Sequence, residues 1–253
     1  MAIFKSSNPI LTNAAYEKSM QVDGVGELRM TERGTLNKFF LLSLLVIATA
    51  SLTWSAYFQS VNIMPFVLIG GFGGFIVAMV LTFKPSWGSV LAPLYALLEG
   101  AFIGGFSAIM QFRFQEKAPD IILQAVGATF GVVLIMYFLY RFKVIKVTEK
   151  FRAIVITAAM GLILFYVVAF ILRLFNVDIP FLHDSSALGI GFSVLVVGLA
   201  SMFLILSFDN VQQGVAMGAP KYMEWYSAFG LVLVIVWLYL EILQLLSRMN
   251  SRN

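Results

Sequence analysis

The amino-acid sequence predicts an all-α, polytopic membrane protein with about seven transmembrane helices in a compact bundle. The first observation is composition: of 253 residues, 60% are hydrophobic and 12% are charged, whereas soluble domains carry about 25% charged residues. The second is that apolar residues gather in runs of about 20, the length that an α-helix needs to cross a bilayer. The third is that short polar connections separate these runs. A bilayer accounts for all three observations, because helix surfaces that face lipid must be apolar.

The first four predicted helices end where polar, proline-containing or basic residues interrupt an apolar run. Proline and glycine clusters punctuate helices, so each interruption is read as a loop. The windows are 39–58, 64–83, 90–110 and 120–142, and the segments that follow them are Gln59–Asn62, Lys84–Ser86, Gln115–Pro119 and the basic connection Arg141–Arg152.

The last three predicted helices are delimited in the same way. Polar and proline-containing segments again separate them, and the final window runs almost to the end of the chain. The windows are 152–175, 186–208 and 226–246, and the separating segments are Asn176–Pro180 and Gly218–Lys221.

The distribution of lysine and arginine predicts the orientation. Residues 1–38 are polar with mixed charge and are expected to form a cytoplasmic N-terminal segment without a cleavable signal peptide. Residues 39–248 then form the transmembrane domain, and residues 249–253 form a short tail. If the helices alternate in direction, about twelve of the 17 basic residues fall on the side of the N-terminus. Since basic loops are retained in the cytoplasm, the C-terminus is expected to lie outside.

Several classes of protein are excluded by what the sequence lacks. There is no cysteine, and His183 is the single histidine, so thiol chemistry and a multi-histidine metal site cannot arise within one chain. The glycine-rich stretch Gly70–Gly74 lies inside an apolar window with no strand before it, so it is not a phosphate-binding loop. We therefore expect neither an enzyme nor a nucleic-acid-binding protein, and no cofactor.

Pairs of glycines four residues apart occur in three predicted helices. Such spacing lets helix backbones approach closely. We expect these positions to pack inside the bundle, and dimerisation is the alternative interpretation. The pairs are Gly70 and Gly74, Gly100 and Gly104, and Gly127 and Gly131.

Glu99 is the most notable acidic residue within an apolar window. It lies about nine residues into the third window, hence roughly 14 Å deep and close to the bilayer midplane. A carboxylate costs several kcal/mol at that depth, so it is expected to face the interior of the bundle. Two interpretations remain open: a protonated carboxyl that hydrogen-bonds a neighbouring helix, or a proton or cation site on a pathway.

Asp209 and Glu224 flank the connection between the last two predicted helices. A helical hairpin can bring them together, and two adjacent carboxylates cannot both ionise cheaply, so they would titrate as a unit. Such a pair could act as a proton-sensitive latch or bind a hard cation such as Ca²⁺ transiently at Asp209. The alternative is two solvated loop carboxylates. Lys84 is a candidate countercharge or, more simply, an anchor at the membrane interface.

Glu241 lies about 17 residues beyond Glu224, hence roughly 25 Å further along the last predicted helix. It is expected near the outer face, at a depth similar to that of Arg173. An ion pair between Glu241 and Arg173 is one possibility. The other is that both side chains extend separately to the membrane interface.

Several short motifs occur in a specific order along the chain. They are Ser7–Pro9, Met30–Thr35, Glu99–Gly104, Lys146–Arg152, Pro180–His183 and Gly218–Tyr226. Their order and spacing resemble the Bax inhibitor / YccA-like family, in particular its bacterial branch with a longer N-terminal segment. The resemblance covers almost the whole chain.

The resemblance implies a seven-helix fold with a central C-terminal helix and a pH-sensitive cation leak, with Ca²⁺ as the expected ion. The leak would be governed by two acidic residues on the last two helices. Asp209 matches the first of them. For the second, the string Leu238–Glu241 favours Glu241, whereas depth in the membrane favours Glu224, and both remain candidates. This sequence departs from the family pattern, because the second acidic residue is glutamate and not aspartate in either alignment.

The resemblance also implies a second functional class, a regulatory membrane protein that acts by binding another membrane protein such as a protease. The polar N-terminal segment suits that role, whereas Glu99 and the acidic hairpin suit a leak. The expected location under either function is a bacterial inner (plasma) membrane, with the lipid bilayer as the surrounding medium.

Overall fold

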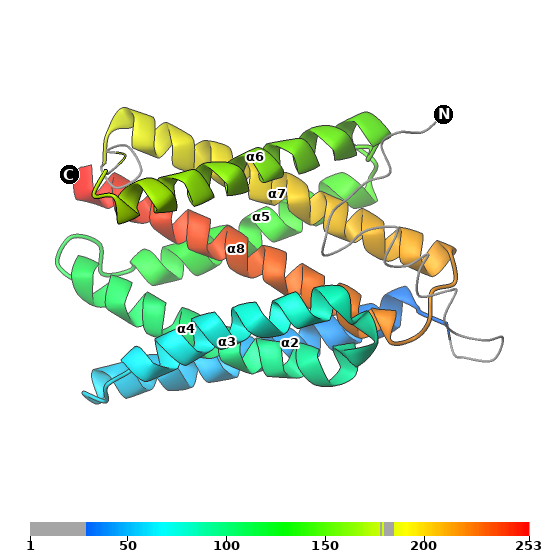
Figure 1. Ribbon diagram of the computed structural model, residues 1–253, viewed down its shortest axis with the longest axis horizontal. Coiled ribbons are helices and arrows are strands. Elements are labelled where there is room, and N and C mark those ends of the chain that lie inside the picture. The colour runs from blue at the N-terminus through cyan, green and yellow to red at the C-terminus, as the bar shows by residue number, and fades with distance from the viewer. Residues whose placement is uncertain (1–28, 178, 180–184, 253) are drawn as a thin grey trace. The chain divides into compact units, whose positions relative to one another are not determined.

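The structure is a computed structural model that describes residues 29–177, 179 and 185–252. These residues form seven α-helices and one short 3₁₀-helix (Figure 1), and all seven α-helices are long and apolar enough to cross a membrane. This confirms the predicted all-α membrane fold. The helices are α2 Glu32–Phe58, α3 Met64–Phe83, α4 Gly88–Phe114, α5 Ile121–Arg141, α6 Glu149–Leu174, α7 Ala187–Ala216 and α8 Met223–Arg252, and the 3₁₀-helix η1 is Pro85–Trp87.

Several helices extend beyond the apolar windows that predict them. Helix α2 begins at Glu32 because Thr31 caps it: the Thr31 Oγ1 accepts a hydrogen bond from the Gly34 N–H at 3.0 Å. Helix α6 begins at Glu149 for the same reason, with Thr148 as its cap. A polar first turn is compatible with a membrane helix, because about 20 residues already span the hydrocarbon core.

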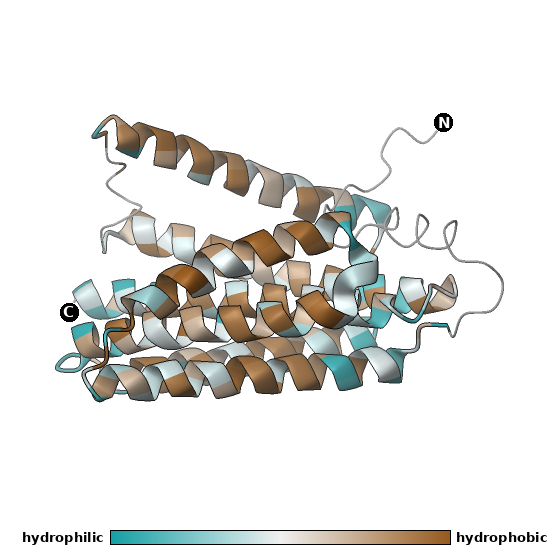
Figure 2. Cartoon of the chain, turned by 60° about the horizontal axis from the view of Figure 1, so that its bottom comes forward, coloured by the Kyte–Doolittle hydropathy of each residue, from teal (hydrophilic) through white to brown (hydrophobic). Residues whose placement is uncertain are grey.

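The outer surfaces of the helices are apolar. Large hydrophobic side chains are exposed along α2, α3, α5 and α6, for example Leu52 at 70% and Phe72 at 70%. Figure 2 shows hydrophobic residues along the lengths of the helices and hydrophilic residues near several of their ends. Helix α8 differs, since 61% of its most apolar window is buried against 17–44% in the other six helices. Exposed apolar side chains of this kind fit a lipid environment.

The chain divides into two compact units, and the divisions fall within α7 and α8. We call them the α2–α4 unit and the α5–α6 unit. Among the described residues, the first contains Arg29 to Arg113 with Ser207–Val234, and the second contains Phe114–Leu206 with the chain from Ile235 onward.

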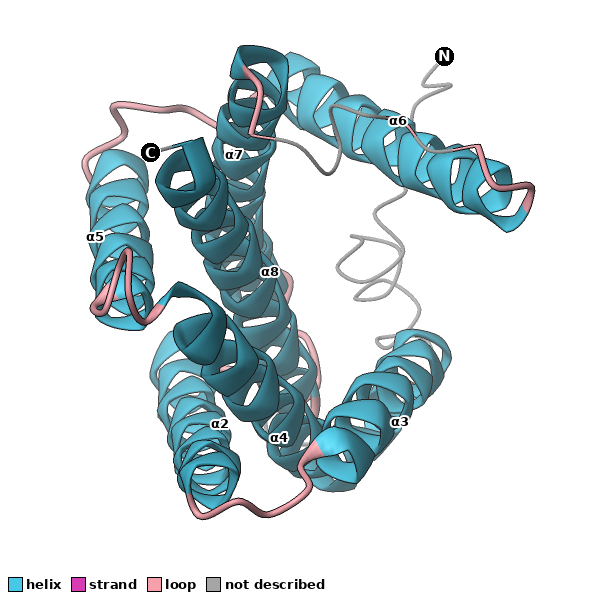
Figure 3. Ribbon diagram, turned by 90° about the vertical axis from the view of Figure 1, so that its left-hand side faces the viewer, coloured by secondary structure: helices cyan, strands magenta, loops and turns pink. Residues whose placement is uncertain are grey.

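In the α2–α4 unit, glycines allow α4 to pack closely against both α2 and α3 (Figure 3). A Cβ placed on Gly104 would lie 2.2 Å from the Ala50 carbonyl oxygen of α2. A Cβ placed on Gly70 of α3 would lie 2.6 Å from the Leu98 carbonyl oxygen of α4. Real Cβ atoms do not approach so closely, so these helix pairs require glycine. The packing interpretation is thus confirmed for two of the three glycine pairs.

The third glycine pair, on α5, behaves differently. A Cβ added to Gly127 or Gly131 would meet nothing within 4 Å among the described residues. The prediction that this pair packs inside the bundle is therefore wrong for the structure described. Spacing alone could not reveal this, because it reports where small residues recur and not whether another helix lies opposite them.

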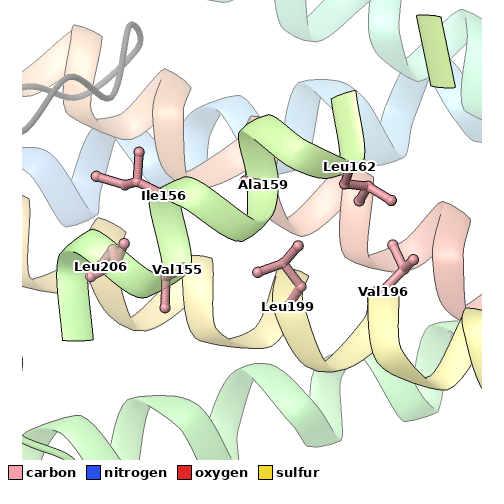
Figure 4. Close-up of a cluster of buried hydrophobic side chains, with 7 residues drawn as sticks. All are labelled: Val155, Ile156, Ala159, Leu162, Val196, Leu199 and Leu206. Atoms are coloured by element: carbon pink, nitrogen blue, oxygen red, sulfur yellow. The ribbon is translucent and has the colours of Figure 1, made fainter. Parts of the chain in front are cut away.

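In the α5–α6 unit, the core is formed by α6 and the first part of α7 (Figure 4). Aliphatic side chains from both helices interdigitate, and partly buried aromatic residues, including Phe192 and Trp237, pack against them. The buried members of the cluster are Val155, Ile156, Ala159, Leu162, Val196, Leu199 and Leu206.

Candidate functional site

The segment before α2 and the connection between α7 and α8 are joined in the α2–α4 unit, near one end of the helices (Figure 1). The Met30 N–H donates to the Ala219 carbonyl at 2.7 Å, and Arg29 and Pro220 form an isolated antiparallel bridge. Gly218 adopts a φ of 70°, a conformation that favours glycine, and faces the Arg29 side chain. We call Arg29–Lys38 together with Gly218–Trp225 the clasp. Two of the motifs that carry the family resemblance thus meet, although they lie far apart in sequence.

Glu224 is the central residue of the clasp. Its side chain is almost completely buried, at 1% exposure for the residue. The Thr31 N–H and the Thr31 hydroxyl each donate to Glu224 Oε1 at 3.0 Å, and Lys38 Nζ forms an ion pair with Oε2. The carboxylate therefore lies at the positive end of the α2 dipole, where a negative charge is favourable.

Gly34 and Trp225 complete the surroundings of this ion pair. A Cβ on Gly34 would lie 2.2 Å from Glu224 Oε1, so a larger residue at this position would displace the carboxylate from where it lies. The Lys38 ammonium also lies 5.4 Å from the centre of the Trp225 ring, within the range of a cation–π interaction. Glu224 is thus held by the N-cap and the first turns of α2 and is not solvated in a loop.

Asp209 lies on α7 in the same compact unit and is half-buried. The Gln213 Nε2 donates to Asp209 Oδ2 at 2.6 Å, one turn along the helix. Within the described residues, the hydrogen bonds of the Glu224 carboxylate go to Thr31 and Lys38, so the structure does not join Glu224 to Asp209. A proton shared between the two acids stays a prediction.

Glu99 lies on α4 with its carboxylate directed at α3. A Cβ on Gly74 would be 2.9 Å from Glu99 Oε2, which places the carboxylate against the α3 backbone. Glu99 also hydrogen-bonds Tyr95, one turn earlier on α4, and the Tyr95 ring packs edge-on against Phe229 of α8 at 4.8 Å. The expectation that this carboxyl faces protein fits these contacts, and a role on an ion pathway stays a prediction.

Lys84 forms no ion pair with Asp209 or Glu224 in the described part of the chain. It follows the end of α3, is exposed, and lies 4.4 Å from the centre of the Trp87 ring. A lysine stacked on a tryptophan at a helix end is typical of the membrane interface. Of the two interpretations of Lys84, this contact favours the interface anchor.

Glu241 belongs to the α5–α6 unit and is buried, at 8% exposure. The Trp237 Nε1–H donates to its Oε1 at 3.1 Å, and the cation that acts on it electrostatically is Arg248. Arg248 also donates to the Gly189 carbonyl at 2.5 Å. Arg173, the partner considered from the sequence, is exposed.

Sequence reasoning missed Thr31, Lys38 and Arg248 as partners of the acidic residues. The only signal for Thr31 and Lys38 was their position in the polar segment just before the first apolar window. Nothing in the sequence connects that segment to residue 224. Arg248 was overlooked because it follows the last apolar window, 226–246, at the very end of the predicted transmembrane domain.

No group of three or more acidic or histidine side chains in the described residues could hold a metal ion. A transient Ca²⁺ contact at Asp209 alone stays a prediction. His183, together with the motifs Ser7–Pro9 and Pro180–His183, lies outside the described residues, as does most of the predicted N-terminal segment 1–38.

Comparison with known proteins identifies the family. The family described as Bax inhibitor 1 like matches residues 8–251, which is nearly the whole chain. No curated protein and no solved structure matches the chain. The match spans all seven helices and both halves of the clasp. The chain belongs to the Bax inhibitor 1-like family.

Proposed function

We propose that this membrane protein is a pH-sensitive leak for cations, with Ca²⁺ as the expected ion, and that Asp209 is central to it. The observation that carries the proposal is a set of polar side chains on the parts of α7 and α8 that belong to the α2–α4 unit. Asp209 is half-buried on α7 beside the buried Ser207 and Asn210, and Ser227 of α8 is fully buried. Ionisable residues inside membrane spans are costly and usually mark ion or proton pathways. Ca²⁺ binds oxygen ligands, chiefly carboxylates, carbonyl and amide oxygens and water.

The pH response would come from Asp209 and an acidic partner on α8, either Glu224 or Glu241. When the two share a proton, the helices stay together. When the proton leaves at higher pH, like-charge repulsion biases the helix pair toward an open state. Lys38 bears on the choice of partner, because it offsets the negative charge of Glu224. Removing Lys38 should therefore move the pH midpoint of the flux if Glu224 is the partner, and leave it in place if Glu241 is.

The test is Ca²⁺ flux into liposomes that contain the purified protein, measured from mildly acidic to mildly alkaline pH. Asp209→Asn should flatten the pH dependence, because the side chain can no longer ionise. Asp120→Asn is a matched control, since Asp120 is exposed between α4 and α5, and it should leave the profile unchanged.

The acidic partner is identified by comparing Glu224→Gln with Glu241→Gln. The change that flattens the profile and adds nothing to Asp209→Asn belongs to the coupled residue. Wild-type profiles in Asp209→Asn and in both glutamate variants would sink the acidic-pair mechanism. A regulatory role, through binding another membrane protein such as a protease, would then replace the leak as the leading proposal.

A further inference from the structure

One open cavity of the α2–α4 unit is lined mostly by residues of the clasp, and the proposed leak assigns no ligand to it. Its volume is about 460 Å³. It is formed by one side of the start of α2 and by the start of α8. The lining residues are Thr31, Arg33, Gly34, Asn37, Lys38, Leu41, Lys221, Glu224 and Trp225.

The lining carries a surplus of positive charge. Three of its side chains are basic and one is acidic. The ion pair between Lys38 and Glu224 cancels one charge of each sign, which leaves Arg33 and Lys221. Both are exposed, and neither is paired with a carboxylate among the described residues. The cavity is therefore suited to an anion.

The lining also changes from polar to apolar along α2. Arg33, Asn37 and Leu41 are four residues apart in succession and form one stripe on that helix, about 12 Å long. Leu41 is 44% exposed and Trp225 is half-buried, so the apolar end is open to a further ligand. A ligand that fits this lining has an anionic end and an apolar end.

The position of the stripe relative to the bilayer supports the same conclusion. Helix α2 has 27 residues and is about 40 Å long, whereas the hydrocarbon core is about 30 Å thick. Its long apolar run begins at Phe39. We therefore expect Arg33 at the level of the lipid headgroups and Leu41 within the hydrocarbon.

We propose that this cavity binds an anionic phospholipid, with Arg33 and Lys221 at the phosphate and with Leu41 and Trp225 against the acyl chains. Basic cavities between transmembrane helices at the membrane surface are suited to anionic headgroups. The amide of Asn37 is a further hydrogen-bond donor for the headgroup. The lipid would also contact α2 and α8 together, next to the Lys38–Glu224 ion pair.

Trp225 provides the probe for a test. The full-length protein is reconstituted in phosphatidylcholine vesicles that contain a small, equal fraction of acyl-brominated phosphatidylglycerol or acyl-brominated phosphatidylcholine. Bromine quenches nearby tryptophan fluorescence, and the contribution of Trp225 is the part lost in Trp225→Phe. The proposal predicts that quenching of Trp225 is several-fold stronger with the anionic lipid than with the zwitterionic one.

The variants decide between a specific site and general attraction. In Arg33→Gln/Lys221→Gln, the ratio of the two quenching constants should fall to about one. In Arg141→Gln/Lys146→Gln, which removes two exposed charges from the connection between α5 and α6, the ratio should stay at the wild-type value. Equal losses in both double variants would mean that net charge, and not the cavity, attracts the lipid.

Two further outcomes would overturn the proposal. A wild-type ratio of about one would mean that the cavity does not prefer an anionic lipid. A high ratio that inorganic phosphate abolishes at constant ionic strength would reassign the site to a free anion. Both Arg33 and Lys221 are exposed, so their replacement by glutamine should not impair folding.

Discussion

At the scale of single residues, the chemistry of this protein depends on how each acidic side chain is partnered. Glu224 has Thr31 and Lys38, Asp209 has Gln213, Glu99 has Tyr95, and Glu241 has Trp237 and Arg248. A buried charge without such partners would cost several kcal/mol. Different neighbouring side chains therefore stabilise each of these acidic residues.

The ion pair between Lys38 and Glu224 gives a prediction about stability. Lys38→Met leaves Glu224 buried with the two Thr31 hydrogen bonds and no countercharge, so the protein should lose about 2 kcal/mol of unfolding free energy. Lys84→Met is a matched control, since Lys84 is exposed and its ammonium lies over the Trp87 ring. It should cost less than about 1 kcal/mol. Unfolding in mixed detergent micelles measures both.

A double-mutant cycle makes the assignment of the pair specific. Glu224→Gln should also destabilise, but Lys38→Met combined with Glu224→Gln should cost less than the sum of the two single changes. Strict additivity would show that the two side chains do not stabilise each other in the membrane.

Glu99 gives a second prediction at this scale. Glu99→Gln should preserve the fold, because the amide can still hydrogen-bond Tyr95 beside Gly74. If Glu99 serves an ion pathway, the same change should reduce Ca²⁺ flux in liposomes. Glu99→Leu should reduce both stability and flux, since it leaves the buried Tyr95 without this partner. Wild-type stability and flux in Glu99→Leu would remove Glu99 from the mechanism.

At the scale of helices, glycine decides which pairs of elements come close. Helix α4 packs against α2 at Gly100 and Gly104, and against α3 at Gly70 and Gly74. A Cβ added at any of these positions would collide with backbone or side-chain atoms. Membrane helices gain little from the hydrophobic effect when they associate, so close packing and hydrogen bonds must hold them together. These glycines are thus structural requirements of the α2–α4 unit.

The two kinds of glycine should respond oppositely to alanine. Gly104→Ala places a methyl group against the Ala50 backbone and should cost about 1–3 kcal/mol. Gly131→Ala on α5 meets open space, so it should be neutral or should stabilise by up to about 1 kcal/mol through helix propensity. Unfolding of the two variants under identical detergent conditions compares them. A large loss in Gly131→Ala would indicate that α5 has a partner, such as a second copy of the chain.

At the scale of the whole molecule, the seven helices make this a multi-pass membrane protein. The side on which each end lies is a proposal that depends on the basic residues. An odd number of spans puts the two ends of the membrane domain on opposite sides. We infer that the N-terminus is cytoplasmic in a bacterial plasma membrane, because helices that alternate in direction would put most lysine and arginine residues on that side.

Fusion reporters test this orientation directly. A reporter after Asn253 should behave as periplasmic, and one within the Arg141–Arg152 connection should behave as cytoplasmic. A cytoplasmic reading at Asn253 would contradict an odd number of spans. The opposite reading at both fusion sites would keep the seven helices but invert the protein.

The sequence by itself determined the number and approximate limits of the membrane-crossing helices and the acidic residues worth attention. It could do so because hydropathy over about 20 residues reports the solvent around a helix, and that is a local property. The helix limits were predicted less well where polar turns continue α2 and α6 past the apolar run, since a cap such as Thr31 acts outside the hydrocarbon core.

Only the tertiary structure decided which residues meet. Glu224 bonds to Lys38 and Thr31, which are 186 and 193 residues away in the chain, and no periodicity connects positions so distant. Two glycine pairs face another helix and the third faces open space, although the spacing is the same. Long-range pairing depends on the packing of whole helices against one another. Hydropathy sets which segments enter the membrane, but it does not set which of their faces come into contact.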